Sequence, residues 1–259
     1  MLDFDFLPPF LLVFMRVSGL MFTSPVFNLR SIPGLTKIGF SFLVAWSMYP
    51  QIPVQLLGSF PSWPYFFQAI SQVAIGLLLG YILNLSVQAV YLAGQLMDMP
   101  MGFGMVNILD PQMGVQVPMM AQFYHLLAIL VFLGVDGHHL LLAGLIRSFR
   151  FIPVGPVAWG GPLLPAFLEA FAWMFLVGVK IALPIVGAIF LTDFVLGIIA
   201  RSVPQINVFI IGFPIKIAVG FFVLLFAIPV YIRFMAGIYG EGGEMIGRLW
   251  QVIAAFGAS

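Results

Sequence analysis

The strongest constraint on the fold is a stretch of 60 residues, from Ile38 to Met97, that contains no charged side chain. A second uncharged stretch runs from Pro111 to Val135. An apolar helix needs about 20 residues to cross the hydrocarbon core of a membrane, so each stretch is long enough. Charged residues make up 7% of the whole chain, where soluble domains carry about 25%. Too few polar side chains are present to cover a globule in water, so the sequence predicts an integral membrane protein.

Turn-forming residues divide the apolar sequence into about six long helices. The alternation of polar and apolar residues that marks a transmembrane β-barrel is missing. The sequence therefore predicts an all-α membrane protein, with helices kinked or broken at prolines such as Pro184 and Pro214. The predicted helices span residues 7–29, 38–58, 66–97, 122–142, 166–200 and 206–232.

We expect one domain over residues 1–259, built mainly from helical hairpins. The Lys and Arg residues are not concentrated on one side of the predicted membrane spans, which indicates that some helices pack against protein and not against lipid. The domain divides into N-terminal helices (1–146) with a Met-rich loop at about 97–120, a connection (147–165), a C-terminal hairpin (166–232) and a tail (233–259).

Six polar residues fall on one stripe of the third predicted helix. Their steps of three and four residues match the repeat of an α-helix. A polar group inside an apolar helix is costly unless it finds a partner. The stripe is typical of a hydrogen-bonding seam between helices, and it also suits the wall of a hydrated passage. The six residues are Tyr81, Asn84, Gln88, Tyr91, Gln95 and Asp98.

The residue patterns that carry enzyme chemistry are missing from the sequence. No Cys is present, which excludes disulfides, thiolate metal sites and cysteine nucleophiles. His138 and His139 are adjacent and would point about 100° apart on a helix, and His125 is distant, so we expect no metal site. No phosphate-binding loop or nucleophile elbow occurs, and a net charge of +1 gives no basic surface for nucleic acid. We expect neither an enzyme nor a bound cofactor.

Isolated charges on the C-terminal helices are most simply interpreted as structural ion pairs. Glu169 and Lys180 are three helical turns apart, and Lys216 lies in the middle of an apolar segment. A proton relay would instead group carboxylates or His on facing helices.

Half of the methionines, 7 of 14, lie between positions 97 and 120 together with several Gly and Pro residues. Met is unbranched and polarizable, and it adapts to varied surfaces. This segment could therefore close a channel while still yielding, or it could fill an irregular gap at a subunit interface. The candidate sealing residues are Gly102, Gly104, Met105, Val106, Ile108, Leu109, Asp110, Pro111, Met113 and Gly114.

A long motif lies at the start of the last predicted helix, in the order Arg-Ser-Val-Pro-Gln-Ile-Asn-Val-Phe followed by Gly-Phe-Pro-Ile-Lys. It resembles the FliR family, whose members are subunits of the flagellar type III protein export gate. The resemblance continues through Phe14-Met-Arg-Val-Ser-Gly-Leu20, Ala93-Gly94, Asp98 and Ser148-Phe149, so it spans nearly the whole chain. The motif residues, for which we expect a role in assembly, are Arg201, Pro204, Gln205, Asn207, Phe209, Pro214 and Lys216.

The resemblance implies a closed helical assembly with FliP-like and FliQ-like subunits in the bacterial inner membrane, within the flagellar basal body. It also implies contacts with FlhA- and FlhB-like export components, with lipid and with unfolded export substrates. In the family, the loop that corresponds to residues 102–118 helps to plug the export channel. The implied function is passage of unfolded flagellar proteins across the membrane.

Three other functions stay open at this point. The homologous subunit of a virulence injectisome would share most of these features. A stand-alone small-molecule transporter would need a convergent polar cluster at mid-membrane, which the sequence does not offer. A scaffold that lines no channel is compatible with every one of these patterns.

Overall fold

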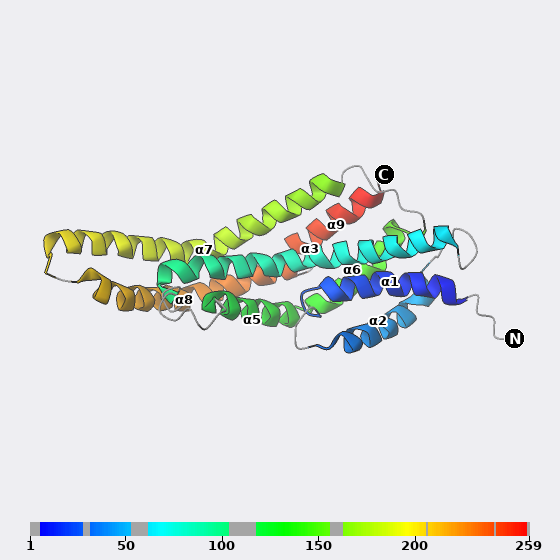
Figure 1. The fold of residues 1–259 in the computed structure, drawn as a ribbon, viewed down its shortest axis with the longest axis horizontal. Coiled ribbons are helices and arrows are strands. Elements are labelled where there is room, and N and C mark those ends of the chain that lie inside the picture. Colours follow the sequence, from blue (N-terminus) through cyan, green and yellow to red (C-terminus); the bar gives the residue numbers. More distant parts are fainter. Residues whose placement is uncertain are drawn as a thin grey trace. The chain divides into compact units, whose positions relative to one another are not determined.

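The computed structural model describes residues 6–27, 32–52, 62–103, 118–155, 163–205, 207–240 and 242–257. These residues are mostly helical and form no β-strand, which confirms the all-α class. A 3₁₀ turn, Tyr49–Gln51, follows the second helix. The α-helices are α1 (Leu7–Thr23), α2 (Gly34–Met48), α3 (Trp63–Met101), α5 (Met119–Gly134), α6 (Gly137–Phe151), α7 (Leu163–Ser202), α8 (Val208–Tyr239) and α9 (Glu244–Gly257) (Figure 1).

Three stretches are long and apolar enough to cross a membrane: α3, α7 and the stretch Ile210–Ala255, which takes in most of α8 and α9. The pair α5 and α6 would make a fourth span if it crosses as one bent unit. The apolar helix α1 is shorter than these spans. The chain is therefore a membrane protein, in agreement with its mean hydropathy of +1.13.

The first two helices end earlier than predicted. Ser24 adopts an extended conformation directly after α1, and Pro25 follows it, so the predicted helix 7–29 stops at Thr23. The helix predicted at 38–58 begins at Gly34, directly after Pro33, and gives way to the 3₁₀ turn that contains Pro50.

The helix predicted at 122–142 is wrong, because two helices occupy this region and meet at an angle of 70°. Asp136 lies between them with a left-handed backbone (φ 57°), a conformation that ends a regular helix. The second helix, α6, continues to Phe151 and so takes up the start of the predicted connection.

The C-terminal region is more helical than predicted. The helix predicted at 206–232 extends to Tyr239 as α8, and α9 occupies a segment expected to be a tail. Prolines 184, 214 and 229 lie inside α7 and α8 and do not end them. Membrane helices tolerate such prolines because neighbouring groups can satisfy the freed carbonyls.

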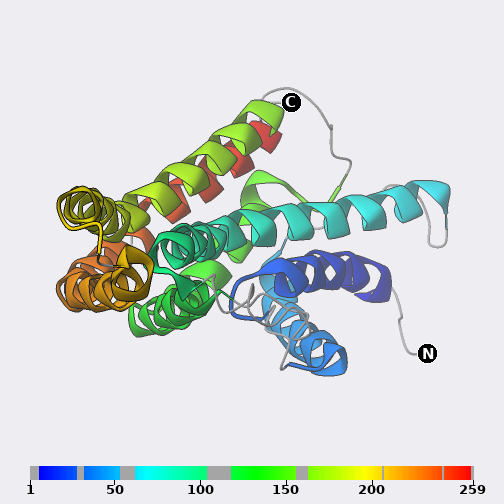
Figure 2. The same cartoon turned by 60° about the vertical axis from the view of Figure 1, so that its left-hand side comes forward.

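The chain forms two compact units, one from residues 1–86, 132–171 and 238–259 and the other from 87–131 and 172–237. In the first unit α1 and α2 lie side by side in both views (Figures 1 and 2). Phe10 on α1 contacts Phe42, Trp46 and Tyr49 edge to face, with centroids 5.3 to 5.8 Å apart. In the second unit the C-terminal part of α7 and the N-terminal part of α8 form the predicted hairpin.

Candidate functional site

Arg16 is fully buried in α1 and connects three helices of the first unit. Its Nε donates a hydrogen bond of 2.7 Å to Oε1 of Gln72 on α3. Its Nη1 donates to Oγ of Ser148 on α6, at 3.5 Å. The guanidinium carbon lies 4.2 Å from the centre of the Phe149 ring, a cation–π geometry. A single side chain therefore joins α1, α3 and α6.

The charge of Arg16 has no carboxylate partner in the described part of the chain. Its Nη2 and Nε2 of Gln72 are also without a hydrogen-bond acceptor among these residues. Burial lowers the pKa of Arg16 to about 9, so the side chain remains protonated at neutral pH. A buried cation without a counter-ion is costly, so the polar contacts and the Phe149 ring must offset the loss of hydration.

Three glycines allow α1 and α3 to cross closely beside Arg16. A β carbon on Gly19 would lie 2.6 Å from the carbonyl oxygen of Val73, and one on Gly76 or Gly80 would overlap the α1 backbone or Thr23. Small residues at such crossings let helix backbones approach each other in membranes. Thr23 donates to the carbonyl of Leu77 at 3.0 Å across the same crossing. This approach places Gln72 within reach of Arg16.

Asp98, near the end of α3, caps the start of α5 in the second unit. Its Oδ1 accepts a hydrogen bond of 3.0 Å from the backbone N–H of Met120. The positive end of the α5 dipole also stabilises a carboxylate at this place. Gly94, one turn earlier, faces Ala121, and a β carbon on it would overlap the Ala121 backbone. Gly94 and Asp98 together fix α5 against α3.

An ion pair links the two arms of the C-terminal hairpin. Nζ of Lys216 on α8 lies 2.5 Å from Oδ1 of Asp193 on α7. The two residues line a pocket of about 250 Å³ together with Gly197 and Phe213. Pairing neutralises the isolated charge that the sequence places inside an apolar helix.

Residues 7–242 match the family model of bacterial export proteins, family 1. The chain belongs to this family. It is 37% identical to the flagellar biosynthetic protein FliR of Bacillus subtilis over 96% of this chain and 97% of that protein. The FliR protein of Pectobacterium carotovorum is 31% identical over 90% of this chain and 89% of its own length. The FliR protein of Escherichia coli is 29% identical over 88% and 87%.

The sequence resemblance to the FliR family is thus confirmed, and the family is one of export proteins, not of enzymes. Several residues that carried the resemblance meet in space. Arg16 contacts Ser148 and Phe149, and Gly94 and Asp98 contact the same turn of α5. These residues therefore hold the helices of this family member together.

The hairpin motif divides between the exposed turn and α8. Arg201 lies in the last turn of α7, and it is exposed, as are Pro204, Gln205 and Asn207. Pro214 is exposed within α8, and Lys216 pairs with Asp193. Phe209 belongs to α8, but its side chain lies outside the described residues.

Most of the predicted sealing loop lies outside the described residues, namely Gly104, Met105, Val106, Ile108, Leu109, Asp110, Pro111, Met113 and Gly114. Gly102 is described, and its φ of 92° suits glycine and ends α3. A β carbon there would lie 3.0 Å from the ring of Phe213. Met101 is buried, and its side chain packs in the space left by Gly220.

The polar stripe of α3 lies mostly on the surface of the chain. Tyr81, Gln88 and Gln95 are exposed, Asn84 and Tyr91 are half-buried, and only Asp98 is buried. Tyr81 stacks on Phe167 with ring centres 5.7 Å apart. Of the six residues, Asp98 serves the start of α5, and the role of the other five stays a prediction.

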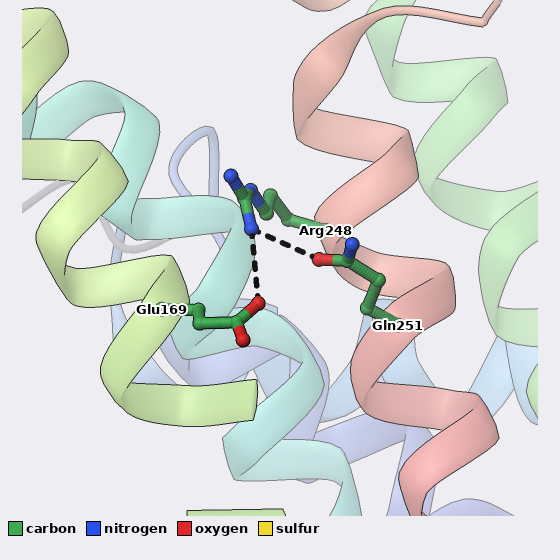
Figure 3. A network of polar contacts seen from close by, with 3 residues as sticks. All are labelled: Glu169, Arg248 and Gln251. Carbon is green, nitrogen blue, oxygen red and sulfur yellow. Dashed lines mark hydrogen bonds and ion pairs between the residues drawn. The ribbon is translucent and has the colours of Figure 1, made fainter. Parts of the chain in front are cut away.

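One polar contact of the first unit could not be found from the sequence. Figure 3 shows Arg248 on α9 between Glu169 on α7 and Gln251, with Nη1 at 3.4 Å from Oε2 of Glu169 and 3.0 Å from Oε1 of Gln251. Because α9 was predicted as a tail, Glu169 had no visible partner. Its 11-residue spacing from Lys180 indicated only that both lie on one face of α7.

Asp136, His138 and His139 lie together at the bend between α5 and α6. One potential ligand atom from each lies within 4.8 Å of the others, and Nδ1 of His139 is 3.5 Å from Oδ1 of Asp136. The His139 and Asp136 side chains are more than two-thirds exposed, and the bend stands at the positive end of the α6 dipole, which disfavours a cation. The arrangement is typical of a contact on the surface between Asp136 and His139, which are three residues apart in the sequence.

Proposed function

We propose that this chain is a subunit of the flagellar type III protein export gate. The observation that carries the proposal is the match to Bacillus subtilis FliR over nearly the full length of both chains. In this proposal FliP-like and FliQ-like subunits complete the gate in the bacterial inner membrane, at the flagellar basal body. FlhA- and FlhB-like components then deliver unfolded flagellar proteins to the channel.

The surface of the chain supports an assembled state. Exposed apolar side chains line both arms of the C-terminal hairpin, a surface that either lipid or an apolar helix can cover; among them are Phe190, Phe194, Phe222 and Leu225, each at least 63% exposed. The exposed polar stripe on α3 adds groups that prefer a hydrogen-bonding partner to lipid. We further propose that the Met-rich loop seals the resting channel and that the stripe faces another subunit or the passage.

The test is replacement of the fliR gene in Bacillus subtilis by the gene for this chain. Expected results are restored swimming and release of flagellar filament protein into the medium. Co-expression with FliP- and FliQ-like subunits is expected to give one complex of defined mass in mild detergent. A stable, monodisperse monomer that does not bind these subunits would contradict the proposal. Rescue of an injectisome mutant without rescue of swimming would reassign the chain to a virulence system.

A further inference from the structure

A groove of about 360 Å³ lies between α5, α7 and α8 in the second unit. Its wall is apolar and aromatic, with Tyr124 and Tyr231 in edge-to-face contact at 4.8 Å. The hydroxyl of Tyr231 donates to the backbone carbonyl of Tyr124, which holds α5 against α8. We define the groove by six of its lining residues: Tyr124, Lys180, Pro184, Phe226, Val230 and Tyr231.

Lys180 is the single charged residue in the lining of this groove. It is exposed, and the described part of the chain forms no ion pair with it. The other lysine of the hairpin, Lys216, has Asp193 as its partner. Lys180 is the eighteenth of the 40 residues of α7, so about 26 Å of helix precedes it and about 33 Å follows it. A lone ammonium at such a place in an apolar span calls for an anion, and no carboxylate of the described residues supplies one.

Pro184 removes a hydrogen-bond donor one turn after Lys180. Proline has no N–H, so it cannot donate to the carbonyl of Lys180, four residues earlier. In a membrane such a carbonyl is satisfied by a donor from a neighbouring helix or by water. The groove therefore presents a cation next to an apolar wall, at a turn of α7 where Pro184 removes one helical hydrogen bond.

We infer that this groove receives an apolar helix of another export-gate subunit, and that a carboxylate on this helix pairs with Lys180. The inference rests on the proposed function. The charge of Lys180 favours an acidic side chain on the partner helix. Phe226 and Val230 in the groove wall are 67% and 68% exposed, so they favour apolar side chains on the rest of that helix. A lipid carries its anionic phosphate at the membrane surface, whereas Lys180 lies near the middle of α7, where a carboxylate on an apolar helix can reach it.

The experiment uses the chain co-expressed with its FliP- and FliQ-like subunits. Lys180→Glu is compared with Arg150→Glu, which makes the same charge change at an exposed residue in the last turn of α6. Lys180→Glu is expected to lower the amount of co-purified subunit about tenfold, because it places like charges together. Arg150→Glu is expected to stay within about twofold of the wild type.

Photo-crosslinking identifies the occupant. With Phe226→p-benzoylphenylalanine we expect an adduct with one co-expressed subunit, at a helix that carries Asp or Glu. Changing that acid to Lys is expected to restore assembly of Lys180→Glu, which a merely misfolded variant would not allow. Adducts with lipid alone, an effect of Lys180→Glu no larger than that of Arg150→Glu, or failure of the charge swap would each overturn the inference while the wild-type complex still assembles. A wild-type chain that binds neither subunit would overturn the proposed function as well.

Discussion

The guanidinium of Arg16 stacks on the ring of Phe149, although the two residues lie on α1 and α6 and are far apart in the sequence. Gln72 adds a hydrogen bond from α3. The contact is notable because the charge is buried without a described carboxylate partner, so shape and polarity together decide which substitutions the site accepts.

Substitutions of Arg16 are expected to rank by the charge they leave behind. Lys keeps a buried cation but loses the Nε–Gln72 hydrogen bond and the flat stacking surface, so we expect a loss of about 3 kcal/mol or more. Met has a similar length and no charge, and is expected to cost less. The measurement is the Tm of the purified complex for Arg16→Lys and Arg16→Met. A Lys variant that matches the wild type would show that the charge alone matters.

Gly76 is expected to accept no side chain. A methyl group there would overlap the backbone of α1, so Gly76→Ala is expected to cost roughly 1–3 kcal/mol by forcing α1 away from α3. Gly187→Ala on α7 is the matched control, because nothing lies within 4 Å of its β-carbon position. Thermal unfolding of the assembled complex tests both. Equal stability of the two variants would mean that the α1–α3 crossing is looser than described.

Removal of the Asp98 carboxylate is expected to loosen the start of α5. Asp98→Ala loses the hydrogen bond to the N–H of Met120 and the favourable contact with the helix dipole, a cost of about 1 kcal/mol. Gln95→Ala, one turn earlier and exposed, serves as control. Amide hydrogen exchange in α5 is the readout. Faster exchange in both variants alike would assign the effect to α3 itself.

Lys216→Ala and Arg201→Ala are expected to impair assembly more than gating. Lys216→Ala leaves Asp193 unpaired in an apolar hairpin, and Arg201→Ala removes a cation from the last turn of α7. Asp193→Ala combined with Lys216→Ala is expected to be less harmful than Lys216→Ala alone, since no unpaired charge remains. Complex yield and protein export are measured together. Normal yield with failed export would place these charges in transport.

Removal of Gly104 to Gln112 is expected to leave the complex assembled and to raise its resting conductance to small ions. A channel wide enough for an unfolded chain leaks unless a compliant element closes it, and one proton crossing 100 mV releases about 2.3 kcal/mol. Met105→Ser with Met113→Ser is expected to have the same effect more weakly, because loop length is kept while apolar contacts are lost. Wild-type conductance in cells that contain intact shortened complexes would place the seal elsewhere.

The sequence by itself determined the class of the protein and most of its long helices. The uncharged stretch from Ile38 to Met97 forced α3, and the apolar segments around Pro184 and Pro214 predicted α7 and α8. Hydropathy and turn residues are local properties, so they predict the positions of helices without knowledge of what packs against them. The FliR-family motif could be identified for the same reason, because its residues lie close together in the sequence.

Only the tertiary structure decided which polar groups meet. The pairs Lys216–Asp193 and Glu169–Arg248 join residues from different helices, and the sequence offers Glu169 no partner because it does not predict α9. The bend at Asp136 depends on one left-handed residue that helical periodicity does not reveal. Arg16 reaches Gln72 because Gly19 and Gly76 let two backbones approach. In a chain with so few charges, the partner of each polar side chain depends on which helices are its neighbours. Close packing between segments that are distant in the sequence determines those neighbours.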